Sequence, residues 1–293
     1  MLGNYLRVRI QHVAECPEVD PLLCAEQEIP DHLHDQQIDW FRLDPTVNVG
    51  LGKGWQVFGE VPVDLRVTRV AYYTLDGAPF DPPYDDIHHR DETRAGLVDG
   101  AVGVRRFGGV GPWVVGGGLG VTLPIGKTEE DPFALTELGL THQHQQFGSG
   151  TFVPTGSVEI VYADARWGAL AWGAGRLPLY ESGKGYRPPG TLTVGGGPTY
   201  RPVVPLQVLV SAELVVEGPE WWSGTPYGGR TALVPGVGVI WGVSDAVVAQ
   251  VQARVTAWQD SREDTAGEGS LVQPVILTLG VSWSPRSREA SAR

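Results

Sequence analysis

Residues 247–257 read Val-Val-Ala-Gln-Val-Gln-Ala-Arg-Val-Thr-Ala, and each odd-numbered position in this stretch is apolar. The even-numbered positions from Gln250 to Thr256 are polar or charged. Successive side chains of a β-strand point to opposite faces, so alternation over this length is typical of a strand with one apolar face and one polar face.

The same alternation recurs along most of the chain. In 206–216 the even positions are all apolar, whereas Ser211 and Glu213 fall on the opposite face. In 57–67 the odd positions carry Val, Leu and one Gly, opposite Glu60 and Asp64. We expect strands near 4–13, 37–51, 55–73, 94–106, 112–126, 150–163, 166–180, 190–200, 205–217, 230–242, 246–259 and 271–283.

The segments between these strands alternate between long and short. The long segments are 14–36, 74–93, 127–149, 181–189, 218–229 and 260–270. Long loops at one end and tight turns at the other end are typical of a transmembrane β-barrel, because lipid offers no hydrogen-bond partner to an open sheet edge. The sequence predicts an all-β fold, a single antiparallel transmembrane barrel of about twelve strands. It would span residues 1–283, with a polar tail at 284–293.

Composition excludes several other classes of protein. The net charge of −12 and the pI near 5.0 argue against a nucleic-acid partner, because no basic face is available to neutralise phosphates. No apolar run is long enough for a membrane helix, and the first residues show no signal-peptide pattern. Cys16 and Cys24 lie eight residues apart, either as a disulfide in an oxidising compartment or as two unpaired thiols. A soluble β-sandwich remains an alternative that the need for detergent would decide.

Polar residues of the alternating segments are expected to point into the lumen of the barrel. Both signs of charge are present, so pairing across the lumen would cost less than isolated charges. The predicted lumen and selectivity residues are Arg7, Arg9, Arg42, Asp44, Glu60, Asp64, Arg66, Asp99, Arg105, Glu159, Glu213 and Arg254.

Six of the seven histidines form three close pairs, one in each of the first three long segments. They are His32 and His34, His88 and His89, and His142 and His144. If these loops share one mouth of the barrel, the imidazoles and nearby carboxylates are suitable ligands for Zn²⁺ or Cu²⁺. Polar histidines exposed on loops are the simpler interpretation, and both stay open.

Catalytic signatures are absent from the sequence. There is no His-Glu-x-x-His helix and no Gly-x-Ser-x-Gly elbow, so we expect no enzyme activity. The long segments are acidic, which would concentrate cations at the mouth and bind the divalent ions that bridge lipopolysaccharide. Membrane lipid, lipopolysaccharide and a small solute are therefore the expected partners.

Two short runs carry a family resemblance. Gly120-Val-Thr-Leu-Pro-Ile-Gly-Lys127, followed after a long segment by Gly148-Ser-Gly-Thr-Phe152, resembles a strand–loop–strand unit of Gram-negative outer-membrane β-barrel proteins. It is similar to barrel families known as transporters or as components of phenol-degradation operons. The alternating segment 277–283 resembles the closing strand of such barrels, although the polar tail follows its terminal Trp283. The resemblance implies the outer membrane as the location.

Two functional hypotheses follow. The first is an outer-membrane channel or transporter that passes a small solute through a narrow, charge-lined lumen. The alternative is an outer-membrane protein with a closed lumen that binds a metal through the histidine pairs. The oligomeric state does not follow from the sequence.

Overall fold

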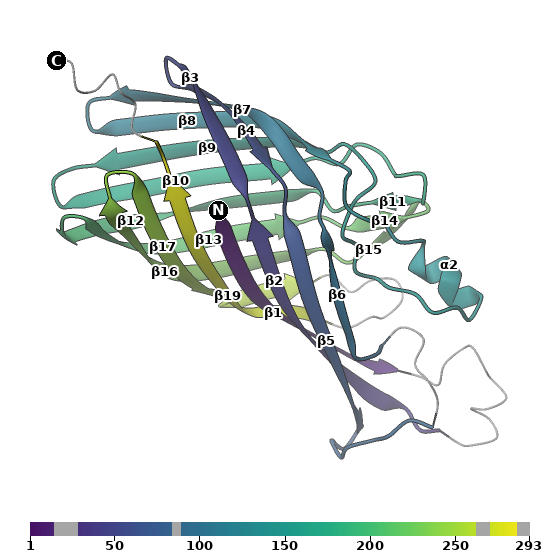
Figure 1. The fold of residues 1–293 in the computed structure, drawn as a ribbon. Helices are drawn as coiled ribbons and strands as arrows, with labels where there is room; N and C mark the ends of the chain where they lie inside the picture. Colours follow the sequence, from purple (N-terminus) through teal and green to yellow (C-terminus); the bar gives the residue numbers. More distant parts are fainter. Residues whose placement is uncertain (15–28, 84–88, 262–269, 286–293) are drawn as a thin grey trace.

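The computed structural model describes residues 1–14, 29–83, 89–261 and 270–285, and nearly all regular structure in this part of the chain is antiparallel β (Figure 1). The first strands are β1 (Leu2–Ala14), β2 (His32–Asp44), β3 (Thr46–Gly52), β4 (Trp55–Glu60), β5 (Val63–Thr74), β6 (Glu92–Leu97), β7 (Gly100–Val110), β8 (Trp113–Leu123), β9 (Pro154–Ala163) and β10 (Trp167–Arg176). The others are β11 (Tyr186–Arg187), β12 (Thr191–Val203), β13 (Leu206–Glu217), β14 (Glu220–Trp222), β15 (Thr225–Tyr227), β16 (Arg230–Ser244), β17 (Val247–Val255), β18 (Trp258–Ser261) and β19 (Ser270–Trp283). A short helix, α2, spans Pro132–Glu137, and no described helix is long and apolar enough to cross a membrane.

Antiparallel pairing runs from neighbour to neighbour around the molecule. The path β7–β8–β9–β10–β12–β13–β16–β17–β19 continues into β1 and then β2. β1 therefore has a partner on each edge: Leu6 lies opposite Trp40 of β2 and opposite Ile276 of β19. The Met1 ammonium also donates to the Val281 oxygen at 2.9 Å, which places the N-terminus beside the last strand.

Four expected strands are each divided into two: one into β17 and β18, and three others at positions that lie side by side. These three divisions separate β2 from β3, β4 from β5 and β6 from β7, and Pro45 and Pro62 lie at two of them. Proline has no N–H to donate to the ladder. Hydrogen bonds nevertheless bridge the divisions, from the Val61 amide to the Pro45 oxygen at 3.2 Å and from the Val98 amide to the Pro62 oxygen at 3.0 Å. Every segment expected to be a strand contains at least one.

The two faces of the sheet differ as the alternation predicts. Directly opposite residues of antiparallel neighbours share a face, so Trp40, Arg66 and Arg94 lie on one face, in register across β2, β5 and β6. This is the inner face. The other, outer face carries exposed apolar side chains, including Leu43, Leu65, Leu97, Leu119, Val158, Leu192, Val210, Val237, Val251 and Leu279.

The long loops gather at one end and the tight turns at the other (Figure 1). At the loop end, the expected loops 181–189 and 218–229 form a small sheet of β11, β14 and β15. Trp222 is fully buried there against Tyr186, with ring centroids 4.5 Å apart. The polar tail predicted at 284–293 lies largely outside the described residues.

Close strand contact requires glycine at position 197, and we expect a measurable penalty for filling it. A Cβ at Gly197 would lie 1.8 Å from the Val210 oxygen on the neighbouring strand, whereas a Cβ at Gly59 meets nothing within 4 Å. Gly197→Ala should lower the free energy of unfolding by about 1–3 kcal/mol. The matched Gly59→Ala should change it by less than about 1 kcal/mol. Urea titration followed by tryptophan fluorescence measures both, and equal values would contradict the close approach.

Candidate functional site

A buried carboxylate on the inner face is held by two arginines. Asp64 has no exposed surface. Arg42 donates to it at 2.7 and 3.0 Å, and Arg66 donates at 2.8 Å. Charge-assisted bonds of this kind compensate a buried carboxylate for its lost hydration. The sequence predicts all three residues as inward-facing, and the structure brings them together.

Arg66 also joins the inner face of the sheet to the long loop between β8 and β9, which comprises residues 124–153 and is hereafter called the 124–153 loop. Its guanidinium lies between two aromatic rings, 4.0 Å from the centroid of Trp40 and 4.3 Å from that of Phe147. It donates to the Gln146 backbone oxygen at 2.9 Å and is only 2% exposed. Phe147 and Gln146 belong to the loop, so the loop packs against the inner face rather than extending into solvent.

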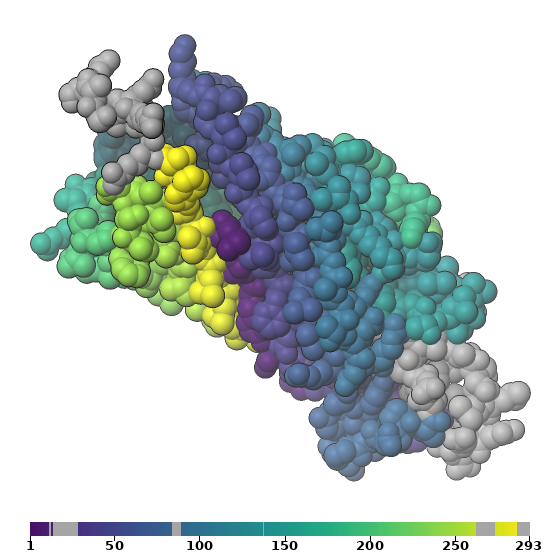
Figure 2. All heavy atoms as spheres, in the orientation of Figure 1, coloured from purple at the N-terminus to yellow at the C-terminus, as the bar shows by residue number. Residues whose placement is uncertain are grey.

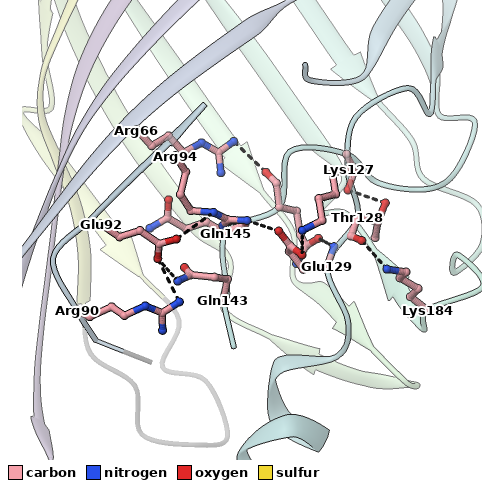
Figure 3. Close-up of polar contacts among 12 residues, drawn as sticks. Arg66, Arg90, Glu92, Arg94, Lys127, Thr128, Glu129, Gln143, Gln145 and Lys184 are labelled. Carbon is pink, nitrogen blue, oxygen red and sulfur yellow. Dashed lines mark hydrogen bonds and ion pairs between the residues drawn. The ribbon is translucent and has the colours of Figure 1, made fainter. Parts of the chain in front are cut away.

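A second arginine holds the same loop one strand further along. Arg94 of β6 donates to the Gln145 oxygen at 3.2 Å and forms a close ion pair with Glu129 (Figure 3). Glu92, on the same strand, accepts from Gln143 and pairs with Arg90 at 3.2 Å. The loop therefore contacts the inner face of both β5 and β6.

Asp99 ties the two ends of the loop together. Its carboxylate accepts from the backbone amide of Gly126 at 3.0 Å, and from the amide and hydroxyl of Ser149 at 2.7 and 2.5 Å. The residue was predicted to line the lumen. Its carboxylate supports the 124–153 loop, and the lumen role stays a prediction.

Further contacts join the 124–153 loop to its neighbours at the loop end. Phe133 of α2 stacks on Tyr227 with centroids 3.8 Å apart. Asp131, which caps α2, accepts from the Ser223 hydroxyl at 2.7 Å, and Lys184 donates to the Thr128 oxygen at 2.8 Å. The loops between β8 and β9, β10 and β12, and β13 and β16 thus form one connected cap.

The inner face of the later strands carries its own charge cluster. Arg254 of β17 donates to the Glu213 carboxylate at 3.1 Å and to the Thr278 hydroxyl at 3.2 Å. Nearer the loop end, Arg230 pairs with Glu217 at 3.2 Å. Glu213, Arg230 and Arg254 line a cavity of about 350 Å³, together with Trp172 and inner-face residues of β12 and β19.

Four other predicted lumen residues share the inner face without joining either cluster. Asp44 accepts from the Asn4 amide at 2.8 Å. The Arg105 guanidinium lies over the Phe58 ring, 4.1 Å from its centroid. Glu60 lies opposite Ala101, and Glu159 lies opposite Gly116 and Trp172, where its side chain is exposed.

Arg7 and Arg9 are on the outer face, contrary to the sequence-based expectation. They pair with Asp39 at 2.9 Å and with Asp35 at 2.6 Å, also outward-facing residues. The inner positions between them are apolar, and Val8 is buried opposite Ile38. Polarity predicts the inward direction only where lipid covers the outer face, and this part of β1 and β2 carries polar side chains outward.

The histidines form two groups rather than one. His34 lies between His32 and His89, with ring nitrogens 3.0 and 3.1 Å apart, which are hydrogen-bond distances. His142 and His144 neighbour each other elsewhere, with centroids 5.1 Å apart. His88 lies outside the described residues. Among the described residues, no group of three or more His, Cys, Asp or Glu side chains is arranged to hold a metal ion, so metal binding stays a prediction from the sequence.

Sequence reasoning missed the aromatic and loop partners of the arginines. Trp40 follows the same two-residue period as Arg42, so the period itself could have identified it. Arg94 could not be found in this way, because it is even-numbered in an expected strand whose predicted inward residues, Asp99 and Arg105, are odd-numbered, and the division between β6 and β7 changes the parity. Gln146 and Phe147 carry no such signal, because they lie in a segment without periodicity.

Comparison with known proteins identifies the fold. No family model and no curated protein matches the sequence. An outer-membrane channel from Pseudomonas putida F1 is similar in structure, with 9% identity over 96% of this chain and 94% of that chain and a TM-score of 0.56. The KdgM porin in complex with disordered oligogalacturonate aligns with 8% identity over 97% and 99% of the two chains, at a TM-score of 0.41. The expected antiparallel β fold, of the kind found in outer-membrane barrel proteins, is confirmed.

Proposed function

We propose that this protein is a passive channel of the Gram-negative outer membrane. A small polar or charged solute would pass between the 124–153 loop and the charged wall of β13, β16 and β17. The observation that carries the proposal is the inner face itself: two charge clusters on opposite parts of the wall, with a cavity of about 350 Å³ against one of them.

We further propose that residues 1–283 form one closed barrel of about twelve spans. Pairing of β1 with both β2 and β19 supports closure. The hydrogen bonds that bridge the divided strands support counting β2 with β3, β4 with β5, and β6 with β7 as single spans. The Ala257 amide, which donates to the Leu233 oxygen at 2.9 Å, supports the same treatment of β17 and β18.

The proposed outer-membrane location rests on the outer face. Apolar side chains there are exposed on strands all around the sheet, a surface that water would disfavour and lipid would cover. Trp55, Trp113, Trp167, Trp241 and Trp283 stand exposed at the turn end, as in an aromatic girdle. We expect a requirement for detergent.

Selectivity is assigned to the inner-face charges. Arg42, Arg105, Asp44, Glu60 and Glu159 on the inner face, with Glu213 and Arg254 at the cavity, would present both signs of charge to a solute. Asp64 and Arg66 are buried and would not contact it directly. A wall that carries both signs has no single-sign ring to favour one kind of ion, so it suits small polar or zwitterionic solutes.

Single-channel recording tests the proposal. The refolded protein, added to a planar bilayer of zwitterionic lipid, should give discrete conductance steps. Refolding is verified independently from its β-type circular dichroism. A folded protein that never conducts would show a plugged lumen and overturn the proposal, as would a protein that stays monomeric and soluble without detergent.

A further inference from the structure

The outer face of β1, β2 and β5 changes from apolar to charged within two residues. Phe41 and Leu43 are exposed and apolar, whereas the next outward positions of β2 toward the loop end are Asp39, Gln37 and Asp35. The N-terminal strands that carry this face run along the surface toward the loop end (Figure 2).

Tyr5 lies where the outer face changes from apolar to charged. Its ring lies beside Phe41, with centroids 5.0 Å apart, and its hydroxyl donates to Asp39 at 2.7 Å. A tyrosine with an apolar ring on one side and a polar partner on the other is suited to the boundary between lipid tails and headgroups. The charged positions beyond Tyr5 therefore lie at headgroup height on the proposed placement in the membrane.

Just beyond Tyr5, toward the loop end, arginine side chains lie over the carboxylates of the outer face and are more exposed than they are. Arg7, Arg9 and Arg69, hereafter the outer arginine patch, have side chains 44%, 53% and 67% exposed. The acidic partners Asp39 and Asp35 are only 13% and 14% exposed. The patch therefore presents guanidinium groups outward, although the positive charge of its three arginines is largely offset by the negative charge of the two aspartates.

The carboxylates also fix how the arginines are presented. Asp35 accepts from Nε and Nη2 of Arg9 at 2.8 and 2.6 Å. Asp39 accepts from Nε of Arg7 at 3.0 Å and forms an ion pair with its Nη2 at 2.9 Å. A guanidinium has five N–H donors, so each arginine retains donors beyond its ion pair. A side chain already held in one orientation loses less conformational entropy when it binds an anion.

We propose that the outer arginine patch binds the phosphate groups of lipopolysaccharide in the outer leaflet. Planar guanidinium groups match phosphate oxygens in geometry and charge. The long-loop end of an outer-membrane barrel faces the outside, which places the patch in the lipopolysaccharide leaflet. This inference rests on the proposed membrane placement, and it is independent of conduction through the lumen.

Equilibrium binding of bisphosphorylated lipid A to the full-length protein in zwitterionic micelles tests the assignment. The double variant R7Q/R9Q should bind about tenfold more weakly or worse, because each arginine contributes charge-assisted hydrogen bonds. The matched control R106Q removes an exposed, outward arginine on the same wall at the turn end and should bind as the unaltered protein does. If the double variant fails to fold, R69Q takes its place. It should weaken binding without a folding penalty, because the ion pair between Arg69 and Asp39 is long, at 3.9 Å.

Two further arms separate the alternatives. The affinity of the unaltered protein for dephosphorylated lipid A should be no higher than the affinity of R7Q/R9Q for bisphosphorylated lipid A. Equal affinity for the two lipids, an equal loss in R106Q, or inhibition by inorganic phosphate at the lipid's own concentration would overturn the proposal. A change in oligomeric mass in R7Q/R9Q, with lipid binding intact, would instead assign the patch to contact with a second copy. Conductance in lipopolysaccharide-free bilayers should be unchanged in R7Q/R9Q, so failure here is distinguishable from failure of the channel proposal.

Discussion

Arg66→Ala releases the 124–153 loop from the inner face and raises the single-channel conductance: this is the largest effect we expect from one substitution. The variant loses the hydrogen bond to the Gln146 oxygen and the contact with the Phe147 ring. A hydrogen bond from a charged donor contributes about 1.5–3 kcal/mol, so the ratio of docked to released loop should fall by at least about tenfold.

Release is measured by chymotrypsin as well as by current. Phe147 is 5% exposed while the loop is docked and becomes a cleavage site when it is not. Arg42→Ala is the matched control, because Arg42 also pairs with Asp64 but has no hydrogen bond to the loop. If both variants are cut at Phe147 at the same rate, the ion pair with Asp64 holds the loop indirectly and Arg66 is not its anchor.

The docked loop also leaves buried hydrogen-bond donors without partners, which is one reason to expect that a single substitution releases it. Nε of Arg66, Nε1 of Trp40 and Nε2 of Gln146 are buried without a hydrogen-bond partner in the structure. Each such donor costs about 1–3 kcal/mol when buried. The remaining contacts therefore have to stabilise the docked loop against this cost.

Arg254→Glu should shift the channel towards cations. The substitution replaces a cation in contact with Glu213 by a second carboxylate beside the cavity. Two unit charges 4 Å apart in water interact by about 1 kcal/mol, so the ratio of cation to anion permeability should rise by about fivefold. Reversal potentials in a salt gradient measure this ratio.

The charge swap E213R/R254E provides the control. It restores one cation and one anion at the same two positions of β13 and β17, and the permeability ratio should return close to its original value. A ratio that Arg254→Glu leaves unchanged would remove the β13–β17 wall from the conduction path.

Alternation alone was sufficient to predict the strands and most of the inner face. It placed Arg42, Asp64 and Arg66 on one face because, over most of each span, the opposite face is apolar. It misplaced Arg7 and Arg9, since outside the apolar band the outer face is polar and alternation no longer distinguishes in from out. There the buried inner positions are Val8 and Ile38.

The packing of the 124–153 loop against the inner face could not be predicted from the sequence. Arg66 and Gln146 are 80 residues apart, and no spacing rule relates a strand position to the backbone of an irregular segment. The histidines show the same limit: proximity of His32 and His34 was evident, whereas contact with His89 depends on how β5 returns beside β2.

The carboxylate of Asp99 makes the 124–153 loop an exchangeable module. Its oxygens accept hydrogen bonds from both Gly126 and Ser149, so the two ends of the segment between them stay in place whatever the sequence of that segment. Closing a longer or shorter segment between fixed ends changes the free energy only slowly with length. Evolution, or a protein engineer, can therefore replace the residues between these two ends while the strands that carry the loop are left untouched.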